Sequence, residues 1–308
     1  ASDVYKRQCK YREKILNLNR VISRGVVIMR EVNVALITDT VKRLSIEANY
    51  FLGADIKESL EKSRKEETYE LAGQVLDKII LNSEIACKEK MPMCQDTGMA
   101  CVFLEIGQDV HFVGGNLEAA INEGVRRGYE DGFLRKSVVD DPIRRVNTKD
   151  NTPAVIYYDI VDGDKVKITL APKGFGSENM SKIGMLKPSD GLEGVKNFVI
   201  ETVKAAGPNP CPPMVVGVGI GGTFDKAAYL AKKALIRPIN TSNKDEFYKA
   251  LEIELLEKIN KLGIGPQGFG GKTTALGLNI ETYPTHIAGL PVAVNINCHA
   301  TRHKEAII

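Results

Sequence analysis

The chain has 308 residues, of which 43% are hydrophobic and 26% are charged, and its formal net charge is +3. This composition excludes a disordered, collagen-like or disulfide-scaffold protein, and the chain is long enough to bury one large core or two smaller ones. No apolar run reaches the ~18–20 residues that a membrane span requires, so we expect no membrane association.

The positive charge is concentrated at the N-terminus. Residues 1–28 contain seven basic and two acidic side chains, or +5, while the remaining 35 basic and 37 acidic residues give −2. The body of the chain therefore offers no general surface for nucleic acid.

Residues 1–28 allow three interpretations. A basic, acid-poor segment is typical of an organelle presequence or of an arm that contacts phosphates. The third, which we favour, is sequence foreign to the mature protein: 2–8 resembles translated sequencing-adapter sequence, and Met29 offers a start before a helix-like stretch. We therefore predict an extension at 1–28 outside the fold and one compact domain at 29–308. The extension has no secretory apolar segment with a cleavage site, which predicts a cytoplasmic protein.

Hydrophobic periodicity predicts an α/β protein, with a mixed α+β arrangement as the alternative. In chain order, helices are expected at 32–52, 67–89, 116–134, 190–206, 224–236 and 245–262. Strands are expected at 99–106, 154–161, 165–171, 214–220 and 291–296. Two of these strands are joined around Asp162-Gly163, which predicts a β-hairpin. No repeat or linker interrupts the pattern, so we expect helices packed on a β-sheet.

Two glycine-rich segments resemble phosphate-binding loops. Residues 217–222 match G-x-G-x-x-G between an apolar run and a helix, which keeps an NAD-binding protein as an alternative. No acidic residue follows at the expected distance of ~20 residues, and a tight turn explains the glycines equally well. Residues 265–273 fail the Walker pattern, because Pro266 occupies a required glycine position. Backbone amides near Lys272 and Thr273 could still bind a carboxylate.

The cysteines fall into two groups. The chain has six, with no C-x-x-C pair, so we expect free thiols in a reducing compartment. Three of them lie in segments rich in proline, glycine or asparagine, where loops form: Cys94, Cys211 and Cys298. Three loop thiolates can hold a [4Fe–4S] cluster and leave one iron open as a Lewis acid. Spacing alone does not exclude scattered buried thiols.

Several polar residues are candidates for substrate binding or proton transfer. Asp96 either lies beside a metal at Cys94 or caps a turn. The loop histidines His286 and His299 are catalytic or structural. The segment 174–179, GFGSEN, permits close approach of a small ligand. A bidentate contact with a substrate carboxylate is possible for four arginines: Arg135, Arg144, Arg145 and Arg302.

Seven long segments of the chain match one known family together. They are MCQDTGMA (93–100), LRKSVVDDP (134–142), NTPAVIYYDI (151–160), KGFGSENMS (173–181), NPCPPMVVGVGIGGTFDKAAYLAKKALIRPI (209–239), LGIGPQGFGGKTTALGL (262–278) and THIAGLPVAVNINCHATRH (285–303). These segments resemble the alpha subunit of class I iron–sulfur fumarate hydratase. The related L-tartrate dehydratase alpha subunit shares the three cysteines but lacks the KGxGSEN, KTTAL and THIAGLPVAVN segments, so the resemblance favours fumarase.

The resemblance implies a complete set of site residues. A [4Fe–4S] cluster with one open iron would be ligated by Cys94, Cys211 and Cys298. The substrate would be contacted by three side chains and one stretch of backbone: Gln95, Asp96, Arg135 and Gly176. The family's active-site histidine corresponds to His286, which is expected to work close to Asp96.

The same resemblance implies a reaction and a partner. The open iron would activate the hydroxyl of malate, Gln95 and Arg135 would orient one carboxylate, and Asp96 with His286 would move the hydroxyl proton. In the family the remaining substrate-binding residues lie in a beta domain, which is missing from a chain that ends at Ile308. We therefore expect a separate fumarate hydratase beta subunit, an α2β2 assembly and a small dicarboxylate substrate. The alternative substrates are tartrate or another hydroxy-diacid.

Overall fold

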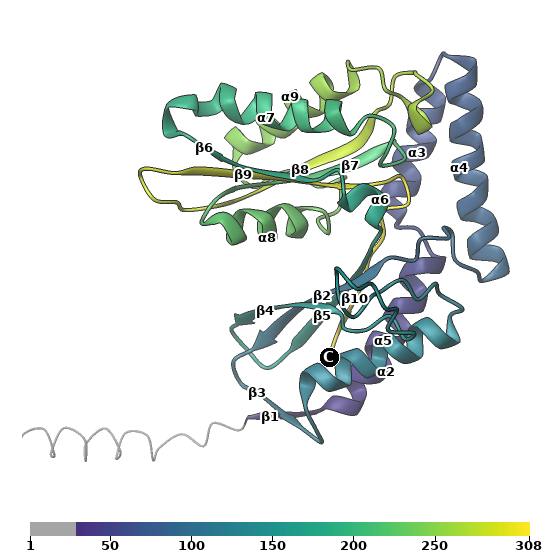
Figure 1. Cartoon of the computed structure of the whole chain (residues 1–308), viewed down its shortest axis with the longest axis vertical. Coiled ribbons are helices and arrows are strands. Elements are labelled where there is room, and N and C mark those ends of the chain that lie inside the picture. The colour runs from purple at the N-terminus through teal and green to yellow at the C-terminus, as the bar shows by residue number, and fades with distance from the viewer. Residues whose placement is uncertain (1–28) are drawn as a thin grey trace, which may run out of the picture.

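The computed structural model describes residues 29–308, so the predicted extension at 1–28 lies outside the described residues. The elements confirm the α/β class (Figure 1). The helices are α2 Val34–Tyr50, α3 Ala54–Glu66, α4 Glu70–Glu89, α5 Leu117–Asp131, α6 Phe175–Glu178, α7 Gly191–Ala206, α8 Phe224–Ala234 and α9 Glu246–Asn260. The strands are β1 Arg30–Asn33, β2 Met99–Gly107, β3 Val110–Val113, β4 Val155–Val161, β5 Val166–Lys173, β6 Lys182–Leu186, β7 Met214–Gly221, β8 Ala275–Tyr283, β9 Leu290–Asn297 and β10 Lys304–Ile307.

Two four-stranded mixed sheets organise the described residues. One has the order β10-β5-β2-β4, and the other has the order β6-β9-β7-β8. Helices α2 and α5 lie along the first sheet, whereas α7 and α9 cover one face of the second sheet and α8 covers the other (Figure 1). Strands β1 and β3 form a separate parallel pair.

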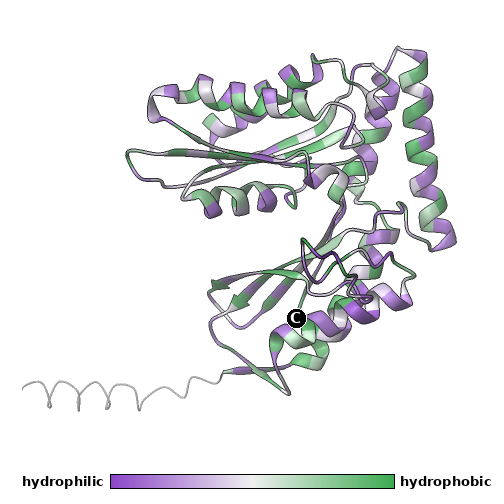
Figure 2. Ribbon diagram, in the orientation of Figure 1, coloured by the Kyte–Doolittle hydropathy of each residue, from purple (hydrophilic) through white to green (hydrophobic). Residues whose placement is uncertain are grey.

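Each sheet has its own hydrophobic core. Val102, Leu104 and Ile168 of the first sheet pack with residues of α2 and α5. Val216 and Val294 of the second sheet pack with residues of α7 and α9. Hydrophobic residues gather on the strands and the inner faces of the helices (Figure 2). The one-domain assignment for 29–308 stays a prediction.

The predicted β-hairpin around Asp162-Gly163 is wrong. Strand β2 lies between β4 and β5, parallel to the first and antiparallel to the second. Strand β2 is almost entirely buried, so its backbone N–H and C=O groups need partners within the protein. A position between β4 and β5 supplies hydrogen bonds on both of its edges. The last residue of β2, Gly107, packs against the turn between β4 and β5. A Cβ at this position would lie 2.3 Å from the Gly163 carbonyl oxygen, so the contact requires a glycine. Asp162-Gly163 correctly predicted a turn, but a turn alone does not determine that the two strands beside it pair with each other.

Some elements were absent from the sequence prediction. Helix α3 was missed because it buries only Ile56, Leu60 and Ser63 and is otherwise polar. Strand β8 was missed because Gly277 and Asn279 lower its strand propensity. Its parallel pairing with β7 stabilises it in the folded chain. The short strands β1, β3, β6 and β10 were also missed, since four or five residues give little periodic signal.

The glycines of the G-x-G-x-x-G segment let α8 pack closely on β7. A Cβ on Gly217 would lie 2.2 Å from the Ala231 carbonyl oxygen, and one on Gly219 would lie 2.2 Å from the Ala227 oxygen. Every residue of β7 is buried. Helix packing therefore accounts for these two glycines without a dinucleotide.

We expect Gly219→Ala to destabilise the fold, because the added methyl group would overlap backbone of α8. Overpacking of this kind typically costs about 1–3 kcal/mol. Chemical denaturation of the variant and the wild type measures the difference. Gly289→Ala is the matched control, since its nearest neighbouring atom would be 3.8 Å away. Equal losses in both variants would contradict the packing explanation.

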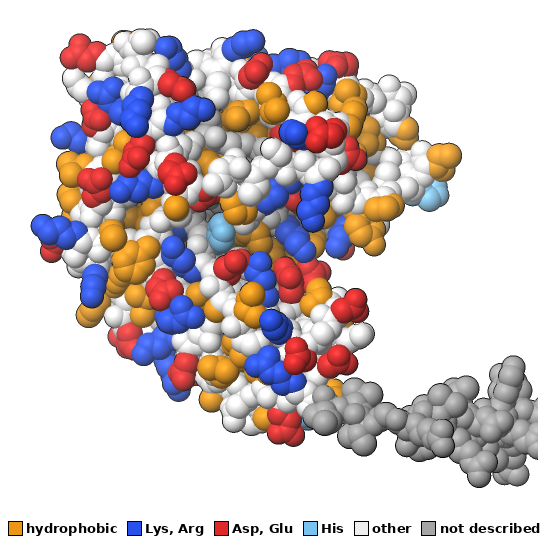
Figure 3. All heavy atoms as spheres, turned by 180° about the vertical axis from the view of Figure 1, so that it is seen from behind, with side chains coloured by type: hydrophobic (Ala, Val, Ile, Leu, Met, Phe, Trp, Pro, Cys, Tyr) orange, Lys and Arg blue, Asp and Glu red, His pale blue; other side chains and the backbone are white. Residues whose placement is uncertain are grey.

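Charges of both signs are interspersed over the surface. Lys and Arg alternate with Asp and Glu on the face shown in Figure 3. Many of them pair locally, such as Arg43 with Glu47 and Lys258 with Glu254. Among the described residues, no helix combines the length and apolar character needed to cross a bilayer.

Candidate functional site

The three candidate ligand cysteines lie in three loops on one side of the molecule. Cys94 lies between α4 and β2, Cys211 between α7 and β7, and Cys298 directly after β9. The Cys94 and Cys298 segments pack against the same small hydrophobic cluster, and the Cys298 loop is hydrogen-bonded to the Cys211 loop. Figure 1 shows the elements that these loops connect. No other cysteine of the described residues lies in a loop: Cys87 is on α4 and Cys101 is on β2.

The three thiols are close enough to affect one another electrostatically. Burial raises the pKa of Cys211, and negative charge on Cys298 and Cys94 raises it further. Burial also raises the pKa of Cys298, while the positive charge of Arg302 opposes that increase. Cys94 and Cys298 also pack against one small cluster formed by Ala86, Met93 and Ala300, and the N–H of His299 binds the Cys211 carbonyl oxygen. The fold therefore brings together the three thiols that the sequence selected.

Hydrogen bonds lock the Cys211 loop to the Cys298 loop. The backbone N–H of His299 donates to the Cys211 carbonyl oxygen over 3.2 Å, and His299 Nδ1 lies 3.0 Å from the same oxygen. The Gln267 amide nitrogen lies 3.0 Å from that Nδ1. Cys211 has a positive φ of 55°, which is uncommon outside glycine. His299 thus has a structural contact that fixes a thiol-bearing loop.

Asp96 joins the Cys94 loop to the glycine-rich turn at α6. Its Oδ1 accepts the Gly98 N–H over 3.0 Å, and its Oδ2 accepts the Phe175 N–H over 2.9 Å. A Cβ on Gly174 would lie 3.2 Å from Oδ2, so a glycine leaves room for this contact. Asp96 therefore caps a turn, as one of the two interpretations predicted, and it does so directly beside Cys94.

The predicted substrate-binding groups lie around the same loops. The Arg135 guanidinium donates to Gln95 Oε1 over 3.3 Å, and both side chains are exposed. The Thr97 hydroxyl donates to the Arg135 carbonyl oxygen over 3.1 Å, which fixes this arginine beside the Cys94 loop. Gly176 lies on α6 facing the Cys211 loop, where a Cβ would be 3.9 Å from the Asn209 oxygen. An exposed, unpaired edge of Arg135 suits a carboxylate ligand.

His286 lies away from the other predicted site residues. It is exposed in the connection from β8 to β9, at the end of β9 opposite Cys298. Because β9 has eight residues and a strand rises ~3.3 Å per residue, the two ends are about 25 Å apart. Asp96 and His286 therefore do not come together within one chain.

A buried lysine that sequence reasoning missed lies behind the site. Lys173, at the end of β5, is 5% exposed, and its Nζ donates to the Ile296 carbonyl oxygen over 2.9 Å and to the Ser177 hydroxyl over 3.0 Å. Glu178 pairs with it over 3.1 Å and also with Lys232 over 2.6 Å. Although burial opposes ionisation, these two cations hold the pKa of Glu178 at about 2. A lysine ending an apolar strand just before GFGSEN was the available signal.

Three cysteine thiols are the donor type that an iron–sulfur cluster takes. A [4Fe–4S] cluster binds each thiolate to a different iron, so its ligands stand farther apart than those of one ion. Within residues 29–308, no three His, Cys, Asp or Glu side chains are close enough to hold one metal ion.

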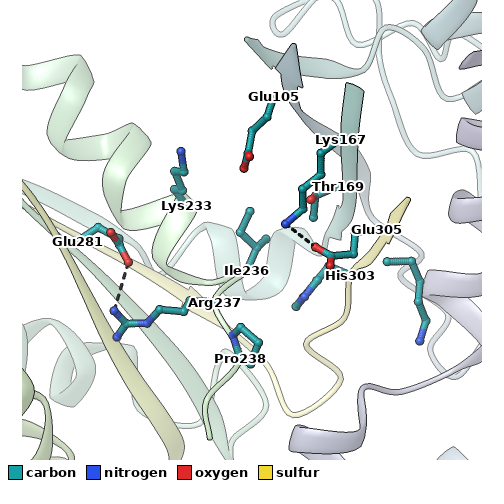
Figure 4. A pocket seen from close by; sticks show the side chains of 11 residues that line it. Glu105, Lys167, Thr169, Lys233, Ile236, Arg237, Pro238, Glu281, His303 and Glu305 are labelled. Atoms are coloured by element: carbon teal, nitrogen blue, oxygen red, sulfur yellow. Dashed lines mark hydrogen bonds and ion pairs between the residues drawn. The ribbon is translucent and has the colours of Figure 1, made fainter. Parts of the chain in front are cut away.

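A large cavity lies elsewhere. It has a volume of about 680 Å³, lies between the two sheets, and contains none of the predicted site residues (Figure 4). Four lysine and arginine side chains line it, and three of them are paired. Lys167 pairs with Glu305 over 2.9 Å, Arg237 with Glu281 over 3.3 Å and Lys233 with Asp159 over 2.6 Å. Most of the positive charge that lines this cavity is therefore neutralised within the chain.

The glycine-rich loop at 265–273 binds a carboxylate of the chain itself. The Lys272 N–H donates to Glu67 Oε2 over 2.7 Å, while the N–H groups of Thr68 and Tyr69 donate to Oε1. Burial favours the neutral acid, but these three donors outweigh it and hold the pKa of Glu67 below its usual value. The predicted anion site is thus an internal contact between this loop and the start of α4.

We expect Glu67→Gln to lower the free energy of unfolding by about 1–3 kcal/mol at pH 7, because an amide cannot accept all three N–H donors. The depressed pKa means that the carboxylate stabilises the fold above its unfolded-state pKa near ~4.5 and loses this effect as pH falls through the lower folded value. The difference between variant and wild type should shrink below pH ~4.5. Denaturation across pH measures it. Glu66→Gln, at the exposed neighbouring residue, should change little. A pH-independent difference would contradict the assignment.

Comparison with known proteins agrees with this geometry. Residues 38–307 match the family described as fumarate hydratase (Fumerase). A Methanocaldococcus jannaschii protein, named provisionally as an L(+)-tartrate dehydratase subunit alpha, is 47% identical over 272 residues, which cover 86% of this chain and 95% of its own length. The L(+)-tartrate dehydratase subunit alpha of Escherichia coli strain K12 is 32% identical over 258 residues, which cover 82% of this chain and 84% of its own.

The match spans both sheets and all three cysteine loops. It begins within α2 and ends within β10. The similarity to named relatives is also well above the level at which only a fold is shared. The chain therefore belongs to the fumarate hydratase (Fumerase) family of hydro-lyases.

Proposed function

We propose that this chain is the alpha subunit of a [4Fe–4S]-dependent fumarate hydratase that interconverts fumarate and L-malate. The observation that carries the proposal is the meeting of three loop thiols beside Asp96, Gln95 and Arg135. Free thiols in all the cysteines of the described residues agree with a reducing, cytoplasmic setting.

The cluster would be held by Cys94, Cys211 and Cys298. When bound, it supplies Lewis-acid activation of the substrate hydroxyl and carboxylate at an open iron. Arg135 binds a carboxylate of the substrate, and Gln95 orients both the arginine and that carboxylate.

Asp96 is the proton carrier for the hydroxyl. Its two backbone donors hold the carboxylate in one orientation beside Cys94, which is the requirement for a general acid–base group. The α6 turn, whose Phe175 N–H binds Asp96, would contribute further N–H donors, including that of Gly176. The base that acts on the substrate C3 proton would come from a beta subunit.

We further propose that His286 acts from a second copy of the chain. It is at the far end of β9 from its own Cys298, and β9 is an inner strand of its sheet, so no loop movement within one chain closes that distance. Ile287 beside it is 91% exposed, as expected for a residue covered by another molecule. A symmetric dimer would bring each His286 to the Asp96 of the other copy. Relatives named as alpha subunits support a beta partner as well, and hence an α2β2 assembly.

Tartrate is the second candidate substrate. The names of the relatives at 47% and 32% identity favour it, whereas the family description favours fumarate. L-Malate and tartrate are four-carbon diacids that differ in one hydroxyl group, so the same Arg135 contact with a carboxylate would serve either.

A substrate panel with the complete complex tests the proposal. The chain is co-expressed with its cognate beta subunit, the cluster is reconstituted without oxygen, and fumarate, L-malate, L-tartrate and methyl-substituted malate are compared by kcat/KM. We expect a brown complex that hydrates fumarate. A brown complex active only on tartrate would select the second candidate. A colourless chain that binds NAD would overturn both.

A further inference from the structure

Arg302 is a buried cation that has no carboxylate partner among residues 29–308. It is 6% exposed, and its guanidinium donates three hydrogen bonds. The acceptors are Asn49 Oδ1 over 3.2 Å, the Ala300 carbonyl oxygen over 2.8 Å and the Asp96 carbonyl oxygen over 2.7 Å. All three acceptors are uncharged, so the hydrogen bonds are satisfied while the positive charge is not neutralised.

Buried charges in proteins are normally paired, because removing an ion from water is costly. The other buried lysine and arginine side chains of residues 29–308 follow this rule. Lys173 pairs with Glu178, and Lys196 pairs with Glu193 and Glu254. Arg302 has no such partner, so its charge calls for a negative group that the described residues do not supply. A cluster or a substrate bound at the cysteine site would provide one.

Arg302 lies beside the cysteine site, since it donates to the carbonyl oxygen of Asp96, two residues after Cys94. Arg302 lies four residues after Cys298, and its guanidinium donates to the Ala300 carbonyl oxygen in the same loop. Three thiolates on a [4Fe–4S] cluster leave net negative charge, and a dicarboxylate adds more. A guanidinium is the cation that remains charged under such conditions.

Arg302 also joins the two cysteine loops mechanically. It binds the carbonyl oxygen of Asp96 on one side and that of Ala300 on the other. Asn49, its third acceptor, in turn accepts the Met93 N–H through its own carbonyl oxygen over 3.0 Å. One side chain thereby fixes residues on both sides of Cys94 relative to the Cys298 loop.

We propose that Arg302 is the internal counter-charge of the thiolate-bound cluster and a positioning residue for the loops that carry Cys94, Asp96 and Cys298. The inference rests on the proposed function, because it requires the cluster. It assigns no direct substrate contact to Arg302, whose guanidinium is occupied by the three protein acceptors.

Two substitutions separate charge from position. Arg302→Met removes both, while Arg302→Lys keeps the positive charge but cannot make three forked hydrogen bonds. Lys196→Met is the matched control, since it removes a buried cation that pairs with α9 instead of contacting a cysteine loop. All are prepared as complexes with the beta subunit, and three quantities are measured: iron retained under chelator, reduction potential of the cluster, and kcat with KM.

For Arg302→Met we expect a more negative reduction potential and about 10- to 100-fold faster loss of iron. For Arg302→Lys we expect a potential near that of the wild type but a lower kcat, because Asp96 is no longer fixed. The control should match the wild type in all three measurements. If Arg302→Met does not fold, the reduction potential of Arg302→Lys still tests the inference. Because this variant keeps the positive charge, a shifted potential would contradict the counter-charge role.

A wild-type potential and iron retention in Arg302→Met would overturn the inference. So would an equal shift in the Met and Lys variants, since charge would then play no part. Failure of the wild-type complex to hold iron at all would instead refute the proposed function. The two failures are therefore distinguishable in one set of preparations.

Discussion

Cys211→Ser should abolish both cluster binding and hydro-lyase activity. Cys211 is the most exposed of the three candidate ligands, and its loop is held by hydrogen bonds to His299 in the Cys298 loop. Removing one sulfur should therefore leave the fold intact while removing one of three ligands. We expect less than ~1% of wild-type activity and loss of most of the iron, measured after anaerobic reconstitution.

The matched control for this prediction is Cys87→Ser. Cys87 is also exposed, but it lies on the outer face of α4. It should retain the iron and the activity of the wild type. Full activity in Cys211→Ser would refute the cluster assignment, and equal losses in both variants would indicate general thiol damage instead of loss of a ligand.

The second large effect is complementation between two inactive chains. Asp96→Asn and His286→Gln should each reduce kcat by about 100-fold or more if the two residues form one acid–base pair. When the two variants are co-expressed, a mixed dimer has one site that carries both substitutions and one site that carries neither. Random pairing should then restore up to about a quarter of the wild-type activity.

Complementation distinguishes a shared site from two independent ones. If His286 served its own chain, each site of a mixed dimer would keep one defect, and activity would stay at the level of the single variants. Co-expression of Asp96→Asn with Cys211→Ser provides the control, because both residues lie in the same chain's cysteine site. In a mixed dimer of this pair, one cysteine site carries Asp96→Asn and the other carries Cys211→Ser. No site is free of a substitution, so we expect no recovery of activity.

The sequence indicated the candidate site residues of this protein more fully than its topology. Proline, glycine and asparagine around Cys94, Cys211 and Cys298 marked them as loop residues, and the structure places their thiols within electrostatic reach of one another. Long helices with strong apolar periodicity, such as α5 and α7, were located to within a few residues. Local signals of this kind depend on neighbours along the chain, so they can be read without the fold.

Pairing between distant segments was decided only by the tertiary structure. The turn at Asp162-Gly163 predicted a hairpin, yet β2 separates its two strands, because burial of β2 outweighs the local preference of the turn. In the same way, the glycine-rich loop near Lys272 predicted an anion site, and only the fold showed that Glu67 is the anion.

The separation of His286 from Asp96 has the same origin. The family resemblance predicts that the two residues work side by side. Strand β9 instead holds His286 at the end of the sheet opposite Cys298. Arg302 is the opposite example. The sequence did not distinguish it from the other candidate arginines, whereas the structure shows that it is buried and has no carboxylate partner among the described residues. Residue types and their local order thus set which groups are available. The long-range contacts of the two sheets decided which of them meet, because those contacts depend on burial and geometry that no short segment encodes.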